Sequence, residues 1–266
     1  MKRILLLSLI ILLLLSLEAC SGRRTDTAVI CAGSTSLQPY VELLSERYKE
    51  INAGSNVEVQ GGGSSAGITA ALDGAADIGM SSRALKETEQ VLWSQEIAKD
   101  GLAIVIHPNN PLFDLSIEEI RKIYSGEITS WSDLGGNDSK IHIITREEGS
   151  GTRSAFEELV MEKVSISPKA IVQDSNGAVR QLVSSDTNSI GYISLGLVDN
   201  TMKAIALDGI EATYDNIVSN TYTLHRPFLF VSLRPPKGEA LRFIEFVMSE
   251  EGQKILTDEG LIPPLE

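Results

Sequence analysis

Three short loops combine glycine with serine or threonine, and each precedes a segment with helical spacing of apolar residues. They cover residues 33–36, 61–65 and 146–153. A helix N-terminus exposes backbone N–H groups that lack partners and carries partial positive charge. Glycine lets a ligand approach that backbone closely, and hydroxyl groups add further donors. Because one chain contains three such loops, the pattern predicts a converging site for a small oxyanion.

The side chains of these loops have the chemistry that protonated phosphate requires. The candidate donors are Thr35, Ser36, Ser64, Ser150, Thr152 and the planar guanidinium of Arg146. Phosphate carries at least one O–H near neutral pH, so a selective site also needs an acceptor. Glu148 can supply it, and its carboxylate would repel fully ionised sulfate. A simpler interpretation is that the hydroxyls cap helices and that Arg146 pairs with Glu147 or Glu148 at the surface.

The N-terminus has the pattern of an export signal. Lys2 and Arg3 precede an almost purely apolar run over residues 4–15, which is too short for a confident membrane span. Residues 17–20, Leu-Glu-Ala-Cys, are similar to a lipobox. We therefore expect a signal peptide over residues 1–19, a lipid on Cys20 and an extracytoplasmic location; an uncleaved signal anchor is the alternative.

The net charge limits the possible partners, and the cysteine count limits the possible disulfides. The chain has a formal net charge of −13, which argues against nucleic acid as a partner. Beyond Cys20 only Cys31 remains, so no disulfide can form within the mature chain. We expect Cys31 to pack in a strand, and we expect no metal and no cofactor.

Alternating strand and helix patterns predict an α/β fold. Strands are expected at 29–32, 57–60 and 76–80, with helices at 39–51 and 66–72 between them. This order implies parallel strands with crossover helices, and ligands bind at the carboxyl ends of such strands. Further strands are expected at 102–107, 141–144, 189–194 and 227–233, and further helices at 116–124, 152–162 and 241–256. The Pro-Asn-Asn-Pro segment at 108–111 predicts a crossing between domains.

The loops resemble those of the periplasmic phosphate-binding proteins, the substrate-binding lipoproteins of the phosphate ABC transporter. The resemblance rests on residues 32–36, 60–67, 76–83, 146–153, 176–179 and 190–193, and it covers nearly the whole mature chain. It implies two α/β domains joined by a two-strand hinge, with phosphate enclosed in the cleft. The expected division is residues 27–106 with 225–266 in domain I, and residues 107–224 in domain II.

The resemblance also implies the ligand contacts. They are Thr35, Ser36, Ser64, Arg146, Ser150, Gly151 and Thr152. Glu148 stands where the family often has Asp, which orients the arginine or faces the ligand. Ser82 stands where some members have an Asp that accepts the phosphate proton, and it is retained as a ligand-binding residue. Whether Arg83 or Arg153 touches the ligand stays open.

The resulting prediction is a monomeric, non-enzymatic protein that binds phosphate with high affinity and delivers it to the permease of an ABC transporter. One alternative is a binding protein for sulfate, molybdate or tungstate. Another is a serine hydrolase, because residues 63–67 match a G-x-S-x-G elbow around Ser65. In that interpretation His225 is the base and Asp174 lies between the two in the chain.

Overall fold

The computed structural model describes residues 28–264. The expected signal peptide over residues 1–19 and the lipidation site at Cys20 lie outside the described residues. Within residues 28–264, no helix is both long and apolar enough to cross a membrane.

The first half of the fold contains three parallel strands joined by crossover helices, as the alternating pattern predicted. Strand β1 (Ala28–Gly33) lies between β2 (Asn56–Gly61) and β3 (Ile78–Ser81), and it pairs in parallel with both. Helices α2 (Gln38–Ile51) and α3 (Ser64–Leu72) connect these strands. Cys31 is fully buried in β1 as a free thiol, and burial raises its pKa.

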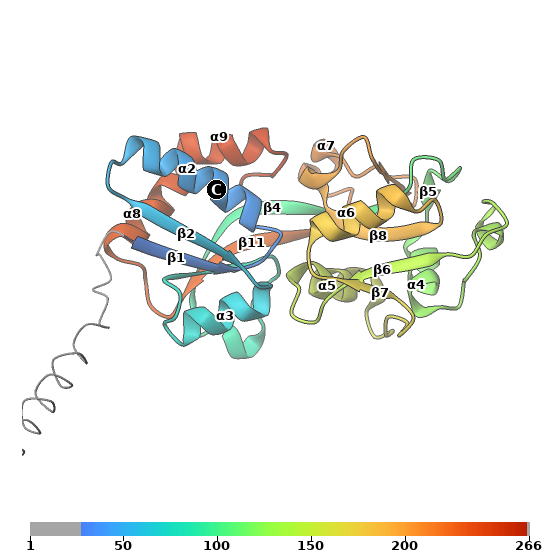
Figure 1. The fold of residues 1–266 in the computed structure, drawn as a ribbon, viewed down its shortest axis with the longest axis horizontal. Helices are drawn as coiled ribbons and strands as arrows, with labels where there is room; N and C mark the ends of the chain where they lie inside the picture. Colours follow the sequence, from blue (N-terminus) through green and yellow to red (C-terminus); the bar gives the residue numbers. More distant parts are fainter. Residues whose placement is uncertain (1–27, 265–266) are drawn as a thin grey trace, which may run out of the picture.

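Two long strands carry the chain between the halves. They are β4 (Trp93–Ile106) and β11 (His225–Ser232), which pair with each other in antiparallel fashion. Figure 1 shows both strands running between the two halves of the molecule. Within β4, Gly101 is still paired with His225 of β11, whereas Leu102 is already paired with Ser194 of β8 (Ser189–Ser194).

The crossing therefore lies inside β4, and its prediction at residues 108–111 is wrong. The sequence pattern does not predict a strand in the first part of β4, because the polar side chains of Gln95, Glu96 and Lys99 are typical of a loop. Pro108 and Pro111 only end the strand after it has crossed. The division of the chain into domains at residues 106 and 225 stays a prediction.

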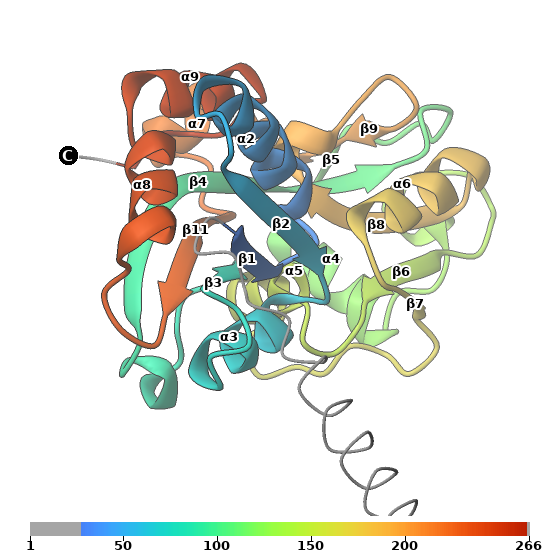
Figure 2. The ribbon, with the colours of Figure 1, turned by 60° about the vertical axis from the view of Figure 1, so that its left-hand side comes forward.

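The second half is a mixed sheet. Strand β6 (His142–Arg146) pairs in parallel with β7 (Ile171–Gln173) and with β8. Short strands β5 (Asp114–Leu115) and β10 (Ala206–Leu207) pair with each other, and β9 (Lys203–Ala204) pairs with β4. The helices are α4 (Ile117–Ser125), α5 (Gly151–Phe156), α6 (Asn176–Ser185) and α7 (Tyr214–Val218). Figure 2 shows α6 lying over β8.

Two helix ends test the local predictions. The helix expected over 116–124 begins with a capping box: Ser116 accepts from the backbone N–H of Glu119, and the Glu119 carboxylate accepts from that of Ser116. The single helix expected over 241–256 is instead two helices, α8 (Gly238–Val247) and α9 (Glu250–Asp258). Ser249 caps α9, and a Cβ on Gly252 would collide with the carbonyl oxygens of Phe246 and Val247, so this turn requires glycine.

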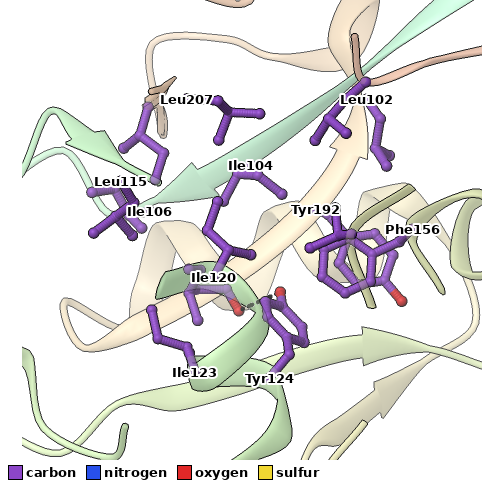
Figure 3. Packing of buried hydrophobic residues seen from close by; sticks show 14 of the residues in the cluster. Leu102, Ile104, Ile106, Leu115, Ile120, Ile123, Tyr124, Phe156, Tyr192 and Leu207 are labelled. Atoms are coloured by element: carbon purple, nitrogen blue, oxygen red, sulfur yellow. Dashed lines mark hydrogen bonds between the residues drawn. The ribbon is translucent and has the colours of Figure 1, made fainter. Parts of the chain in front are cut away.

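Each half has its own hydrophobic core. In the second core Phe156 stacks on Tyr192 with ring centroids 4.1 Å apart, and Tyr124 packs against both rings (Figure 3). Leu102, Ile104 and Ile106 of β4 belong to this core, whereas the first core contains other residues of β4, α2, α8 and β11. Each half is therefore packed around its own buried residues, and β4 contributes to both cores.

Candidate functional site

The three glycine-containing loops converge where the two halves meet. The backbone N–H of Gly63 donates to the carbonyl of Gly33 (2.9 Å), so the first two loops lie side by side. The N–H of Ser65 donates to the carbonyl of Gly149 (3.1 Å), which brings in the loop of the second half. These loops follow β1, β2 and β6, and their predicted location at the carboxyl ends of the strands is confirmed.

Arg146 is the charged centre of this site. It is the last residue of β6, and only 1% of its surface is exposed. Its Nη2 donates across the interface to Thr35 Oγ1 (2.9 Å), and its Nη1 donates to Asn176 Oδ1 (3.2 Å). The guanidinium is thus held rigidly between the two halves.

Glu147, and not Glu148, orients the arginine. The two carboxylate oxygens of Glu147 accept from Arg146 Nε (2.9 Å) and Nη2 (3.0 Å). The Glu147 backbone still donates to Gln173 beside β7 (3.0 Å), so its side chain stays next to the arginine. Glu148 follows at the turn into Gly149, whose φ is +91°, and it is exposed. The expectation that Glu148 orients Arg146 is therefore wrong, and its contact with a ligand stays a prediction.

Hydroxyl groups from both halves meet beside the guanidinium. Ser36 Oγ lies 2.7 Å from Thr152 Oγ1, which also accepts from Arg146 Nη1 (3.4 Å). Asn176 Nδ2 donates to Ser36 Oγ (3.1 Å). Ser36, Thr152 and Asn176 are all buried, so their hydrogen bonds form away from bulk solvent.

Three further serines, Ser34, Ser64 and Ser82, form a compact cluster from the first half. Ser34 Oγ donates to Ser82 Oγ (2.8 Å), and Ser64 Oγ accepts from the Ser82 backbone N–H (3.0 Å). Gly151, the first residue of α5, packs on this cluster: a Cβ there would collide with Ser64 Oγ and Ser82 Oγ. Ser150 caps α5 by accepting from the backbone N–H of Arg153 (3.3 Å).

The structure therefore brings together every predicted site residue except Glu148. The residues that it assembles are Thr35, Ser36, Ser64, Ser82, Arg146, Ser150, Gly151 and Thr152. Sequence analysis missed roles for Ser34, Glu147 and Asn176. Asn176 carried a usable signal, because it follows the helix-capping Ser175 and so lies at the start of α6.

The other two arginines near the loops have partners of their own. Arg83 makes a bidentate ion pair with Glu89 (2.7 and 2.9 Å), which lowers the pKa of that carboxyl. Arg153 Nε donates to Glu157 (2.8 Å), and its Nη1 donates to the carbonyl of Arg146 (3.1 Å). Arg153 therefore connects α5 to the end of β6, whereas the side-chain hydrogen bonds of Arg83 stay within residues 83–89.

The chemistry of the site is that of an anion clamp. Apart from the Glu147 carboxylate, which accepts from Arg146, its polar groups are hydroxyls, backbone amides, one amide side chain and one guanidinium, and these donate hydrogen bonds. No group of three or more histidine, cysteine or acidic side chains with metal-binding geometry occurs in residues 28–264. The arrangement is suited to a tetrahedral oxyanion, which can accept from both halves at once.

The proposed hydrolase residues lie in different surroundings. His225 Nε2 is 3.1 Å from Asn220 Oδ1, and its ring lines a surface hollow with Lys99 and Ile262. Ser65 lies instead at the meeting of the loops, beside Gly149. Desolvation, with a contribution from Lys99, lowers the pKa of His225.

Comparison with known proteins agrees with this architecture. The model of the PBP superfamily domain matches residues 21–251. The phosphate-binding protein PstS of Bacillus subtilis is 31% identical over 252 residues, which is 92% of this chain and 84% of the relative. PstS of Borreliella burgdorferi is 31% identical over 257 residues, 91% of this chain and 92% of the relative.

Two solved structures are similar in fold and sequence. One, from Clostridium perfringens, is assigned as a phosphate ABC transporter substrate-binding protein and contains phosphate; it has a TM-score of 0.87 and 41% identity, and covers 90% of this chain and 100% of that one. The other, an ABC-type phosphate transport receptor from Vibrio cholerae, has a TM-score of 0.75 and 39% identity, with 89% and 100% covered. The fold, the clamp of donors between its halves and these matches lead to one conclusion: the chain belongs to the PBP superfamily, in its family of phosphate-binding proteins.

Proposed function

We propose that this chain binds inorganic phosphate between its two halves and delivers it to the permease of an ABC transporter. The observation that carries the proposal is the convergence of loops from both halves on the buried Arg146, whose guanidinium bridges Thr35 and Asn176. A solved relative that is 41% identical contains phosphate. Such a site would close on its ligand by bending at β4 and β11.

The residues that would contact phosphate come from both halves. They are Thr35, Ser36, Ser64 and Ser82 in the first, and Arg146, Ser150, Gly151 and Thr152 in the second. We add Ser34 and Asn176, because both are buried within the same network. A bound anion would take over hydrogen bonds that these groups make with one another, and the new bonds would be charge-assisted and therefore stronger.

The cellular setting follows from the same function. An exported monomer with a lipid on Cys20 would hold the site outside the cytoplasmic membrane and close to the permease. The site needs no covalent chemistry, since capture and release of the anion suffice. We therefore propose a transport component without catalytic activity.

Calorimetric titration with phosphate, of the full chain in detergent after removal of bound ligand, tests the proposal. We expect one phosphate per chain and loss of binding in an Arg146→Gln variant. Arg180→Gln is the matched control, because Arg180 is exposed on α6 and, within residues 28–264, forms its ion pair with Asp199. Heat from sulfate, molybdate or tungstate but none from phosphate would reassign the ligand. Equal phosphate binding by both variants would refute the role of the clamp.

A further inference from the structure

A hollow of about 420 Å³ opens on the second half, at the end of the sheet opposite to the anion clamp. It lies between Gly126 directly after α4, His142 at the start of β6 and Ile171 at the start of β7. His142 and Arg146 are the first and last residues of β6, so the rise of a strand separates their backbones by about 13 Å. Figure 1 shows α4 on the side of the second half that faces away from the first. This distal hollow is therefore separate from the clamp, and its volume is in the range of small-molecule sites.

The floor of the distal hollow is apolar. Ile141 and Ile143 line it and are buried residues of the second core, and Ile128 packs against the same core. Ile171 completes the floor from the edge strand β7 and keeps 45% of its surface exposed. The second core thus reaches the surface here, and an apolar ligand would remove these isoleucine side chains from water.

Two lysines stand beside this apolar floor. Lys140 and Lys169 both line the hollow, and neither forms an ion pair within residues 28–264. They come from the segments that lead into β6 and β7, whose pairing begins at Ile144 and Ile171, so both reach the same edge of the sheet. None of the lining residues is acidic, although the whole chain has a net charge of −13. An anionic group at this edge would meet two ammonium groups that have no carboxylate partner.

His142 adds a third nitrogen group to the lining. Its Nδ1 lies 2.6 Å from Asp186 Oδ2, and this contact fixes the ring. The other oxygen of Asp186 accepts from the backbone N–H of Asn188 (2.9 Å), so the carboxylate is occupied. Within residues 28–264 no hydrogen bond uses His142 Nε2, which leaves this nitrogen for a ligand. The other carboxylate bonded to a lining residue is that of Glu127, 3.4 Å from Ser125 Oγ, and Glu127 is exposed.

We propose that the distal hollow binds a small organic anion with an apolar body, of the class of aromatic carboxylates. The body of the ligand lies on the isoleucine floor, and its carboxylate meets Lys140, Lys169 and Nε2 of His142. Inorganic phosphate does not fit this site, because it would leave the isoleucines in contact with water. An uncharged aromatic molecule would cover the floor but gain nothing from the lysines. Since the hollow and the clamp lie at opposite ends of β6, both can be occupied at once.

The test is a titration with 2-naphthoate, followed by NMR of isoleucine methyl groups in the full chain in detergent with excess phosphate. Uncharged 2-naphthamide is the control ligand, and partition of both into protein-free micelles is measured and subtracted. We expect 2-naphthoate to shift the methyl signals of Ile128, Ile143 and Ile171, but not that of Ile51 on α2, with a Kd on the order of 1 mM or tighter.

The amide should bind at least about tenfold more weakly than the carboxylate. Absence of shifts at the three isoleucines up to about 10 mM 2-naphthoate, or equal affinities of carboxylate and amide, overturns the inference. These methyl groups report on the distal hollow whether or not the chain binds phosphate, so failure of the proposed function would not imitate either result.

A double variant, Lys140→Gln with Lys169→Gln, tests the role of the charges. It should bind 2-naphthoate about tenfold more weakly than the wild type and bind 2-naphthamide equally well. The matched control is Lys49→Gln with Lys237→Gln, which makes the same change of net charge at exposed positions of the first half. If both double variants lose the same affinity for 2-naphthoate, or neither loses any, the lysines of the hollow do not recognise the anion and the inference fails.

Discussion

A methyl group at Gly151 should stop the two halves from closing. Gly151 packs on Ser64 and Ser82, and an added Cβ would overlap both hydroxyl oxygens and lie 3.0 Å from the backbone carbonyl carbon of Ser82. The backbone atom cannot move aside without shifting β3, so the halves must separate. Gly151 is the first residue of α5, where alanine is the better helix former, so each half should keep its own stability.

The cost of that separation follows from the bonds across the interface. They include Ser36 to Thr152 (2.7 Å), Arg146 to Thr35 (2.9 Å) and the Ser65 N–H to the Gly149 carbonyl (3.1 Å). At roughly 1 kcal/mol each, their loss amounts to about 3 kcal/mol. We therefore expect a Gly151→Ala variant to bind phosphate about 100-fold more weakly.

Titration calorimetry measures this change, and circular dichroism with a thermal melt confirms that the variant is folded. Gly177→Ala is the matched control, because Gly177 also lies in the first turn of a helix and an added Cβ there meets only Ser175 Oγ, 3.9 Å away. Phosphate affinities of Gly151→Ala and Gly177→Ala that both equal the wild-type value would show that the ligand-bound state does not bring α5 onto the serine cluster.

Three further changes probe other parts of the structure. Asn176→Ala removes a buried amide that bridges the halves, and should weaken phosphate binding by about 10- to 100-fold in calorimetry. The control Asn137→Ala, at an exposed position, should leave phosphate binding unchanged. Equal losses of affinity in the two variants would contradict a role of Asn176 in the site. Asp100→Asn leaves the buried charge of Arg226 on β11 without its ion-pair partner, and should lower the free energy of unfolding by about 3–5 kcal/mol in urea titration. An unchanged urea midpoint would contradict a stabilising role of this ion pair. Burial, with Lys99, lowers the pKa of His225, so the unfolded chain takes up the proton first; stability should be full above about pH 6.5 and fall as the pH drops toward the lower folded-state pKa. In a His225→Gln variant, the midpoint of thermal unfolding should change less between pH 7.5 and 5 than in the wild type. If the midpoint falls with pH as steeply in the variant as in the wild type, His225 is not the cause of the pH dependence.

The errors of the sequence analysis share one physical cause, which is that tertiary contacts overrode a local pattern. The first part of β4 is polar along much of its length, and its pairing with β11 makes it a strand. The break between α8 and α9 depends on the close approach of Gly252 to the carbonyls of Phe246 and Val247. Helical periodicity continues through that break, so the sequence pattern alone could not reveal it.

The choice between Glu147 and Glu148 illustrates the same limit. Both carboxylates lie close enough to Arg146 in sequence to pair with it. The backbone hydrogen bond from Glu147 to Gln173, the last residue of β7, keeps Glu147 at the sheet. The positive φ of Gly149 turns the chain directly after Glu148. A side chain's direction at the end of a strand depends on these backbone bonds.

By itself the sequence determined the α/β class, the parallel strands and the presence of hydroxyl-bearing loops at their carboxyl ends. These properties follow from hydrophobic period, glycine placement and strand order, which are local or nearly local. Only the tertiary structure decided which groups face one another across the halves, namely Ser36 with Thr152, Arg146 with Thr35 and Gly151 with the serine cluster. Those pairs are far apart in the chain or depend on how two packed bodies meet, and no local pattern encodes the angle at which β4 and β11 bring them together.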